Sequence, residues 1–266
     1  MKKHYSSFLY FLFFCLPLLW VGCNPTLVEQ KNDFDFKVIE TGSISKLRVK
    51  AFNGGITVRP SSDSKLHLKS ILRQPDQIDY TIKKSDTEIL IEAEQNKRDV
   101  RPIPGATFEI QVPYPMQLDL SSSNGSIILS YLESDVKIKT SYGSVSINES
   151  TGSYDIELKD GSIYLDSVQG ELKVRTNKGD IELKSPISAT SIYDLQTKTG
   201  DIYLSLANKG LSEISIQAVT KNSPVRNFSS IIDIDPDEQK FISLKGKSSP
   251  SLKAKSNNGF IEIDSY

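Results

Sequence analysis

The stretch Leu118–Leu204 decides the fold: LDLSSSNGSIILSYLESDVKIKTSYGSVSINESTGSYDIELKDGSIYLDSVQGELKVRTNKGDIELKSPISATSIYDLQTKTGDIYL. It repeats one 18-residue pattern with glycines at Gly125, Gly143, Gly161 and Gly179, and a slightly later copy is centred on Gly200. Relative to each glycine, the residues at −7, −5, +2 and +4 are apolar or tyrosine, and those between are mostly polar. The +2 position, for example, holds Ile127, Val145, Ile163, Ile181 and Ile202.

Strict alternation of apolar and polar residues over about five positions indicates a β-strand with one buried face. Each repeat contains two such strands, and its glycine lies in the turn between them. Glycine adopts the positive backbone angles that tight turns require. The repeat therefore predicts pairs of short strands and excludes helix.

A fixed period of this length favours an all-β, repeat-built β-solenoid, in which each 18-residue coil stacks on the one before. Like residues would then form columns, and two thin sheets would share one core. The alternative is a long antiparallel meander or sandwich, which Gly152 and Gly170 allow because they divide the repeat into nine-residue units. A meander, however, needs a second layer to cover its apolar face.

The repeat also occurs near both ends of the chain. Around Gly54, Leu47 and Val49 precede and Ile56 and Val58 follow at the same offsets, and a last copy surrounds Gly259. Between the first copy and the central array, about 60 residues alternate like strands without the repeat. We interpret this segment as an antiparallel insertion that covers one end of the stack, because an open end exposes unpaired backbone groups.

The N-terminus has the features of an export signal at residues 1–22. Lys2 and Lys3 precede an apolar run of 14 residues, Phe8–Val21, which is shorter than the roughly 20 that span a bilayer. The run ends in Trp20-Val21-Gly22-Cys23, which resembles the lipobox of bacterial lipoproteins, although Trp20 replaces the usual leucine. We therefore predict lipidation at Cys23 and a polar tether over 23–33. The alternative is ordinary signal cleavage with Cys23 incidental.

The remaining chain, 34–266, is predicted to be a single domain without a disulfide, because Cys15 leaves with the signal. The full chain of 266 residues has 32 basic and 33 acidic residues. This balance gives no sign of a polyanion partner and does not favour nucleic acid. A membrane partner is expected through the lipid anchor alone.

Few residues suggest chemistry. Asp233, Asp235 and Asp237 alternate like the start of a calcium loop, but the EF-hand pattern fails after them, so an acidic surface turn is the preferred interpretation. Asp180 and Asp201 would repel one another on adjacent coils, which would favour recruitment of a cation or of Lys198, but solvated turn residues are the preferred interpretation. His67 is the one histidine after the signal, so no metal site, cofactor or catalytic residue is expected.

The +3 position points outward and holds Ile128, Ser146, Tyr164, Glu182 and Tyr203. Ile128, Tyr164 and Tyr203 are therefore a candidate contact column for a glycan or protein ligand. Aromatic residues are also simply good strand formers.

The units Ser-Asn-Gly-Ser-Ile at 123–127, Asn-Lys-Gly-Asp-Ile at 177–181 and Asn-Asn-Gly-Phe-Ile at 257–261 resemble the bacterial toastrack, or "putative adhesin", family. The resemblance covers roughly residues 40–265. It implies a stacked β-strand protein of the cell envelope, without an agreed activity and without catalytic residues to transfer.

We therefore expect a lipid-anchored envelope protein that faces the periplasm or the exterior, with a non-enzymatic binding, adhesin-like or structural role. One alternative is a carbohydrate-active enzyme on a β-helix scaffold, which would need two carboxylates about 5–10 Å apart in a cleft. The other is an envelope-stress sensor or assembly accessory.

Overall fold

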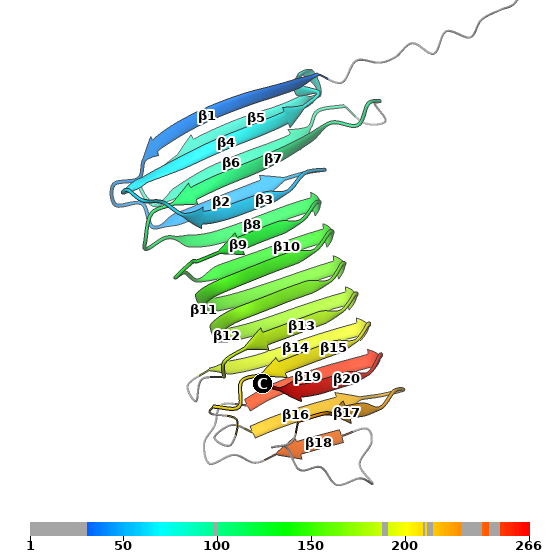
Figure 1. Ribbon diagram of the computed structural model, residues 1–266. Coiled ribbons are helices and arrows are strands. Elements are labelled where there is room, and N and C mark those ends of the chain that lie inside the picture. The colour runs from blue at the N-terminus through cyan, green and yellow to red at the C-terminus, as the bar shows by residue number, and fades with distance from the viewer. Residues whose placement is uncertain are drawn as a thin grey trace, which may run out of the picture.

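The computed structural model describes residues 31–97, 101–187, 191–209, 211, 215–229, 241–244 and 251–266. These residues form an all-β structure, a single curled sheet of 20 strands that also contains the short 3-10 turn η1 (Pro75–Gln77). No helix in these ranges has the length and apolar character needed to cross a membrane. Figure 1 shows the strands stacked like rungs from β1 at one end to β18 at the other.

The central array has the parallel pairing expected of stacked coils. Like positions of successive repeats lie opposite one another, so that Leu118 pairs with Val136, Val136 with Tyr154 and Tyr154 with Leu172. The alternating antiparallel pairing of a meander does not occur here. Gly152 and Gly170, which made that alternative plausible, lie at a second bend inside the long strands β11 (Val145–Asp160) and β12 (Ile163–Lys178).

The curled sheet has two walls, because each coil contributes one strand to either side. Wall A contains, along the stack, β5 (Ile78–Lys84), β6 (Glu88–Gln95), β2 (Lys46–Ala51), β8 (Gln117–Asn124), β10 (Val136–Tyr142), the second halves of β11 and β12, β14 (Ile192–Thr199), β19 (Ser251–Asn258), β16 (Ser215–Thr220) and β18 (Phe241–Leu244). Wall B contains, in the same direction, β1 (Asn32–Glu40), β4 (Lys65–Arg73), β7 (Gly105–Val112), β3 (Ile56–Pro60), β9 (Ile127–Ser130), the first halves of β11 and β12, β13 (Ile181–Ser185), β15 (Ile202–Leu206), β20 (Ile261–Ser265) and β17 (Val225–Asn227).

The order of the coils differs from the order of the chain at both ends. The first repeat copy, β2 and β3, lies between β6–β7 and β8–β9, and the last copy, β19 and β20, lies between β14–β15 and β16–β17. In Figure 1 the C-terminus accordingly lies within the stack and not at its end.

The predicted antiparallel insertion is only partly correct. Strands β6 and β7 pair in parallel with β2 and β3, and therefore form a further coil. The antiparallel cover consists of β5 on β6, β4 on β7 and β1 on β4. Strand β1 starts at Asn32, two residues inside the segment that we interpreted as a tether.

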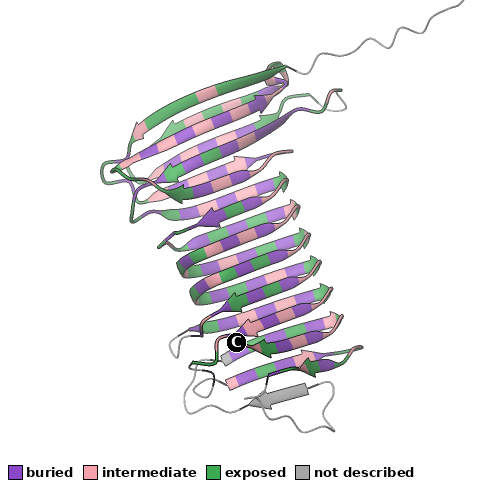
Figure 2. Ribbon diagram, viewed as in Figure 1, coloured by how far each residue is buried: buried purple, intermediate pink, exposed green. Residues whose placement is uncertain are grey.

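The interior is filled by the columns that the repeat predicts. Ile127, Val145, Ile163, Ile181 and Ile202 are all 0% exposed, and the −7 and −5 residues of wall A join them in one hydrophobic cluster. Figure 2 shows this alternation as buried and exposed bands along the strands of the central array. Each buried aliphatic side chain contributes about 1.5–3 kcal/mol as an upper estimate.

The glycine turns bring the backbones of successive coils into direct contact. A Cβ on Gly161 would lie 2.0 Å from the carbonyl oxygen of Gly143, and one on Gly259 would lie 1.9 Å from that of Gly200. Buried hydroxyls at the −3 position complete the turn, since Thr197 donates a hydrogen bond of 3.0 Å to the carbonyl of Gly179. The equivalent bonds are those from Ser122 to Gly54, from Thr176 to Gly161 and from Ser256 to Gly200.

Substitution of Ile163 by Asp should disrupt the central array. The carboxylate would be buried in a dry column without a partner, which costs about 3–5 kcal/mol of the free energy of unfolding. Ser146→Asp, which faces outward between Ile128 and Tyr164, is the matched control and should change stability little. A chemical denaturation midpoint for Ile163→Asp equal to that of the control would show that the inward face is assigned wrongly.

Substitution of Gly161 by Ala should destabilise the stack by about 1–3 kcal/mol or more, because the methyl group meets backbone and the backbone angle φ is +147°. Gly42 is the control, since its φ is +57° but a Cβ added there would meet no atom within 4 Å. Gly42→Ala therefore adds only the cost of the left-handed conformation, about 1–2 kcal/mol. Equal urea midpoints for the two variants would mean that close approach of the coils is unimportant.

Candidate functional site

A shallow groove of about 1150 Å³ runs along the outer face of wall A. Its lining comes from eight neighbouring strands, β6, β2, β8, β10, β11, β12, β14 and β19. With about 4.8 Å between strands, the groove is roughly 34 Å long. Its residues belong to the −4, −3 and −2 positions of the repeat, so it lies beside the glycine turns. We call it the wall A groove.

The wall A groove is basic although the chain as a whole is nearly neutral. Its charged lining residues are Lys50, Lys139, Lys159, Arg175, Lys198 and Lys255 against Glu94 and Glu157. Most of the other lining residues are serine, threonine, asparagine or glutamine. The 18-residue period therefore gathers cations on one face that the composition alone does not reveal.

Some of these cations are paired. Lys139 lies 2.8 Å from Glu157 on the next coil, and this hydrogen bond raises the pKa of Lys139 and lowers that of Glu157. Arg175 binds Asp194 at 2.8 Å. Both pairs lie on an exposed surface, where an ion pair contributes little to stability.

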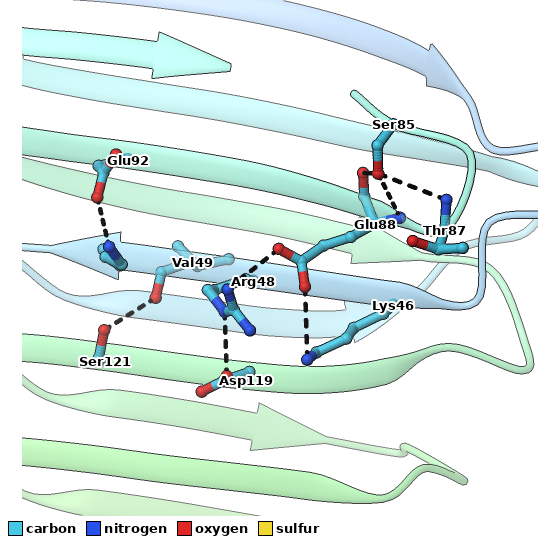
Figure 3. Close-up of polar contacts among 10 residues, drawn as sticks. Lys46, Arg48, Val49, Ser85, Thr87, Glu88, Glu92, Asp119 and Ser121 are labelled. Atoms are coloured by element: carbon cyan, nitrogen blue, oxygen red, sulfur yellow. Dashed lines mark hydrogen bonds and ion pairs between the residues drawn. The ribbon is translucent and has the colours of Figure 1, made fainter. Parts of the chain in front are cut away.

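Ion pairs brace the coils where the groove begins on β6 and β2. Figure 3 shows Glu88 between Lys46 and Arg48, at 3.4 and 3.2 Å, while Arg48 also reaches Asp119 at 3.1 Å. Beside them Lys50 lies 2.6 Å from Glu92, and their hydrogen bond raises the pKa of the lysine and lowers that of the glutamate.

The −6 column forms one border of the groove and alternates in charge. Neighbouring residues along it have opposite signs at every step: Arg48, Asp119, Lys137, Asp155, Lys173, Asp194 and Lys253. Opposite charges on adjacent strands attract, whereas like charges there destabilise a sheet. This column is nearly neutral within itself, and among its carboxylates Asp194 is the one that the ion pairs of the described residues connect to a groove cation, Arg175.

The predicted contact column lies on the opposite wall. The strand register places Ile128, Tyr164 and Tyr203 in one line on wall B, but Ser146 and Glu182 separate them. Ile128 is 38% and Tyr164 47% exposed. The ring of Tyr203 packs edge-on against Phe260, with 5.4 Å between centroids. The pKa of Tyr203 is raised, first by desolvation and then by Asp201 and Asp180.

Asp180 and Asp201 each accept a hydrogen bond from the backbone of the next coil. Asp180 accepts a hydrogen bond of 2.8 Å from the backbone N–H of Asp201, and Asp201 accepts one of 2.9 Å from that of Phe260. Each carboxylate thus links its coil to the next one through a backbone donor. Both residues belong to the glycine turn and stabilise it.

The predicted cation turn, Asp233, Asp235 and Asp237, and the predicted lipidation site, Cys23, lie outside the described residues. Within the described residues, no group of three histidine, cysteine or acidic side chains is placed to hold a metal ion. Surface residue His67 lies 2.9 Å from Asp63 through its Nε2 atom, and this hydrogen bond is the main reason that the pKa of Asp63 falls to about 2.

The two carboxylates that line the wall A groove are too far apart to act together as the acid pair of a glycoside hydrolase. Its two carboxylates are Glu94 on β6 and Glu157 on β11, which are four strands apart. Four steps of about 4.8 Å separate them by roughly 19 Å along the stack. Glycosidic cleavage requires two carboxylates about 5–9.5 Å apart.

The wall A groove was not predicted from the sequence, because the prediction rested on the buried positions of the repeat and on the +3 column. The signal was nevertheless present in the sequence, at the outward positions −4 and −2 of wall A. These positions hold a lysine or arginine in the copies around Gly54, Gly143, Gly161, Gly179, Gly200 and Gly259. In the sequence, the +3 position was the one outward column that we recognised, because it contains two tyrosines.

Three solved structures resemble the chain at low identity. A "putative adhesin" of Bacteroides fragilis NCTC 9343 is 14% identical, with a TM-score of 0.44, over 88% of this chain and 97% of that one. A "putative cell adhesion protein" of Clostridium sporogenes ATCC 15579 is 12% identical, with a TM-score of 0.41, over 89% and 100%. A "putative adhesin" of Parabacteroides merdae ATCC 43184 is 10% identical, with a TM-score of 0.36, over 88% and 96%.

No curated protein matches the chain. A family model matches residues 42–264, which extend from the first repeat copy into the last strand. The matched range contains every repeat copy and the antiparallel strands between them, and it excludes the N-terminal segment with Cys23. The chain therefore belongs to the family Toastrack DUF4097.

Proposed function

We propose that the protein is a lipid-anchored, non-enzymatic binding protein of the cell envelope, with an adhesin-like role, that holds an extended ligand in the wall A groove. The observation that carries this proposal is the shape of the groove, which crosses eight strands and follows the stack axis. A compact ligand would use only part of such a site. A chain-like ligand would use its whole length.

Rigidity of the wall supports this function. The groove residues project from strands whose backbones are held by parallel pairing and by the glycine turns. The backbone of such strands loses little further freedom when a ligand binds, which favours affinity. We infer that the stacked coils form a β-solenoid throughout, so that each added coil lengthens the binding face without changing it.

The contact column of wall B, Ile128, Tyr164 and Tyr203, remains the second candidate site. Its support is the partial exposure of an isoleucine and tyrosines along one line. Tyrosine offers both an apolar ring and a hydroxyl to a partner. The polar residues between these side chains limit the apolar area that one ligand could cover.

One pair of variants distinguishes the two walls. Ser141→Trp fills the wall A groove, whereas Ser146→Trp covers the wall B column, and both serines are half-buried on outward positions. We expect the detergent-solubilised full chain to bind members of an array of cell-surface glycans and extended peptides. We also expect Ser141→Trp to lose at least about tenfold in affinity for them, and Ser146→Trp to bind as before.

Loss of binding by Ser146→Trp, with Ser141→Trp binding as before, would show that the site lies on wall B. Unchanged binding by both variants, or no binding by the unaltered protein, would contradict the proposed function. Circular dichroism melting curves of the variants check that a bulky tryptophan has not unfolded the coil.

Lipid anchoring is tested by Cys23→Ala. Loss of the acylated residue should release the protein from the membrane fraction, because the anchor supplies the apolar surface that holds it there. Cys15→Ala is the control, since that cysteine leaves with the signal peptide. Membrane fractionation with radiolabelled palmitate measures both. Continued palmitate labelling of Cys23→Ala would contradict the anchor.

A further inference from the structure

The wall A groove contains one cation per coil over five consecutive coils. Along the stack, Lys139 on β10 is followed by Lys159 on β11, Arg175 on β12, Lys198 on β14 and Lys255 on β19. Their repeat positions alternate between −4 and −2, so the cations form a zigzag. With about 4.8 Å per coil, the five charges extend over roughly 19 Å.

Three of these five cations carry charge that is not neutralised. Lys139 and Arg175 are paired with Glu157 and Asp194. Among the described residues, no carboxylate lies within 4.0 Å of the ammonium groups of Lys159, Lys198 and Lys255. Lys159 lies instead 5.6 Å from the ring centre of Tyr142. All three lysines are exposed, so a ligand in the groove can reach them.

Polar uncharged side chains fill the positions between the cations. The groove contains Ser121, Ser123, Ser141, Asn177, Gln196 and Asn257. Hydroxyl and amide groups of this kind donate and accept hydrogen bonds and match the hydroxyl groups of sugars. Regularly spaced cations match a ligand with regularly spaced negative charges.

We propose that the wall A groove binds a linear acidic polysaccharide, a chain of sugars that bear carboxylate or sulfate groups, along the stack axis. This proposal rests on the proposed function and specifies its ligand class. Part of the binding free energy would come from the attraction between the groove cations and the anionic groups of the ligand. Dissolved ions screen this attraction, so the affinity should fall as the salt concentration rises. The chain as a whole carries a net charge of −1, so the attraction is local to this face.

The lining argues against nucleic acid as the occupant. Proteins that hold single strands stack the bases on exposed aromatic rings. Among the described residues that line the groove, the one aromatic residue is Phe52, which is 8% exposed and cannot offer its ring as a platform. The exposed ring of Tyr142 borders the groove beside Lys159, and a single ring does not stack successive bases. A sugar chain needs no such platform where hydroxyl and amide groups alternate with cations.

The test uses the full chain in detergent with three probes: oligogalacturonate, the same oligomer with its carboxylates methyl-esterified, and single-stranded DNA of similar length. Lys198→Gln/Lys255→Gln removes two unpaired charges from the groove. Lys184→Gln/Lys209→Gln removes two exposed lysines from outside it and is the matched control.

We expect oligogalacturonate to bind, its ester to bind at least about tenfold more weakly, and affinity to fall with sodium chloride. The groove variant should lose about tenfold in affinity for oligogalacturonate, and the control no more than about twofold. Equal binding of acid and ester, or equal losses in groove variant and control, would overturn the assignment to an acidic ligand. DNA binding as tight as oligogalacturonate binding would overturn the assignment to a polysaccharide.

The failure of this inference differs from the failure of the proposed function. If Ser141→Trp abolishes binding while Lys198→Gln/Lys255→Gln does not, the groove is the site and its ligand is not acidic. If neither variant changes binding, the groove is not the site and both proposals fall.

Discussion

The close approach of backbones at the glycine turn is the constraint on which the rest of the structure depends. In the central array, the α-carbon of each repeat glycine faces the carbonyl oxygen of the preceding glycine in the stack, at a separation that leaves no room for a Cβ. Because these turns stack directly, the coils cannot slip by a residue relative to one another. A slip of one residue would exchange the buried and exposed faces of both walls.

Because the register is fixed, equivalent positions of successive repeats lie in columns along the stack. The residues of each column share one structural role. The columns at −7, −5, +2 and +4 fill the core, and the hydroxyls at −3 cap glycine carbonyls. Ala51 and Leu158 replace the hydroxyl at −3 in two coils and are buried there instead, and Thr140 donates to the carbonyl of Tyr142. The outward columns are free of packing demands, so they can carry charge in a pattern. That freedom explains how a chain with balanced charge presents a basic groove.

The columns could be predicted from the sequence because they depend on local alternation and a constant period. Ile163 and Gly161 both have the roles that the repeat assigns to them. The order of the end coils could not be predicted. Strand β6 has the same alternation whether its neighbour is parallel β2 or an antiparallel strand, and nothing in its residues specifies the partner. The hydrogen bonds of Asp180 and Asp201 were not predicted either. The sequence shows that two carboxylates lie on adjacent coils, but it does not show which backbone N–H groups lie beside them.

The two ends of the stack also differ in a way that bears on how the groove is presented. At one end β4 and β5 pair antiparallel with the strands of the end coil and β1 pairs antiparallel with β4, so that these strands cover the edges of the coil and protect them from pairing with other chains. Strand β1 is the first element after the segment that contains Cys23, and nine residues of extended chain reach at most about 30 Å. The proposed anchor at Cys23 would therefore hold the covered end near the membrane. The groove cations begin on β2, next to the covered coil, and continue to β19 toward the other end of the stack, so that the proposed anchor would hold most of them away from the membrane surface.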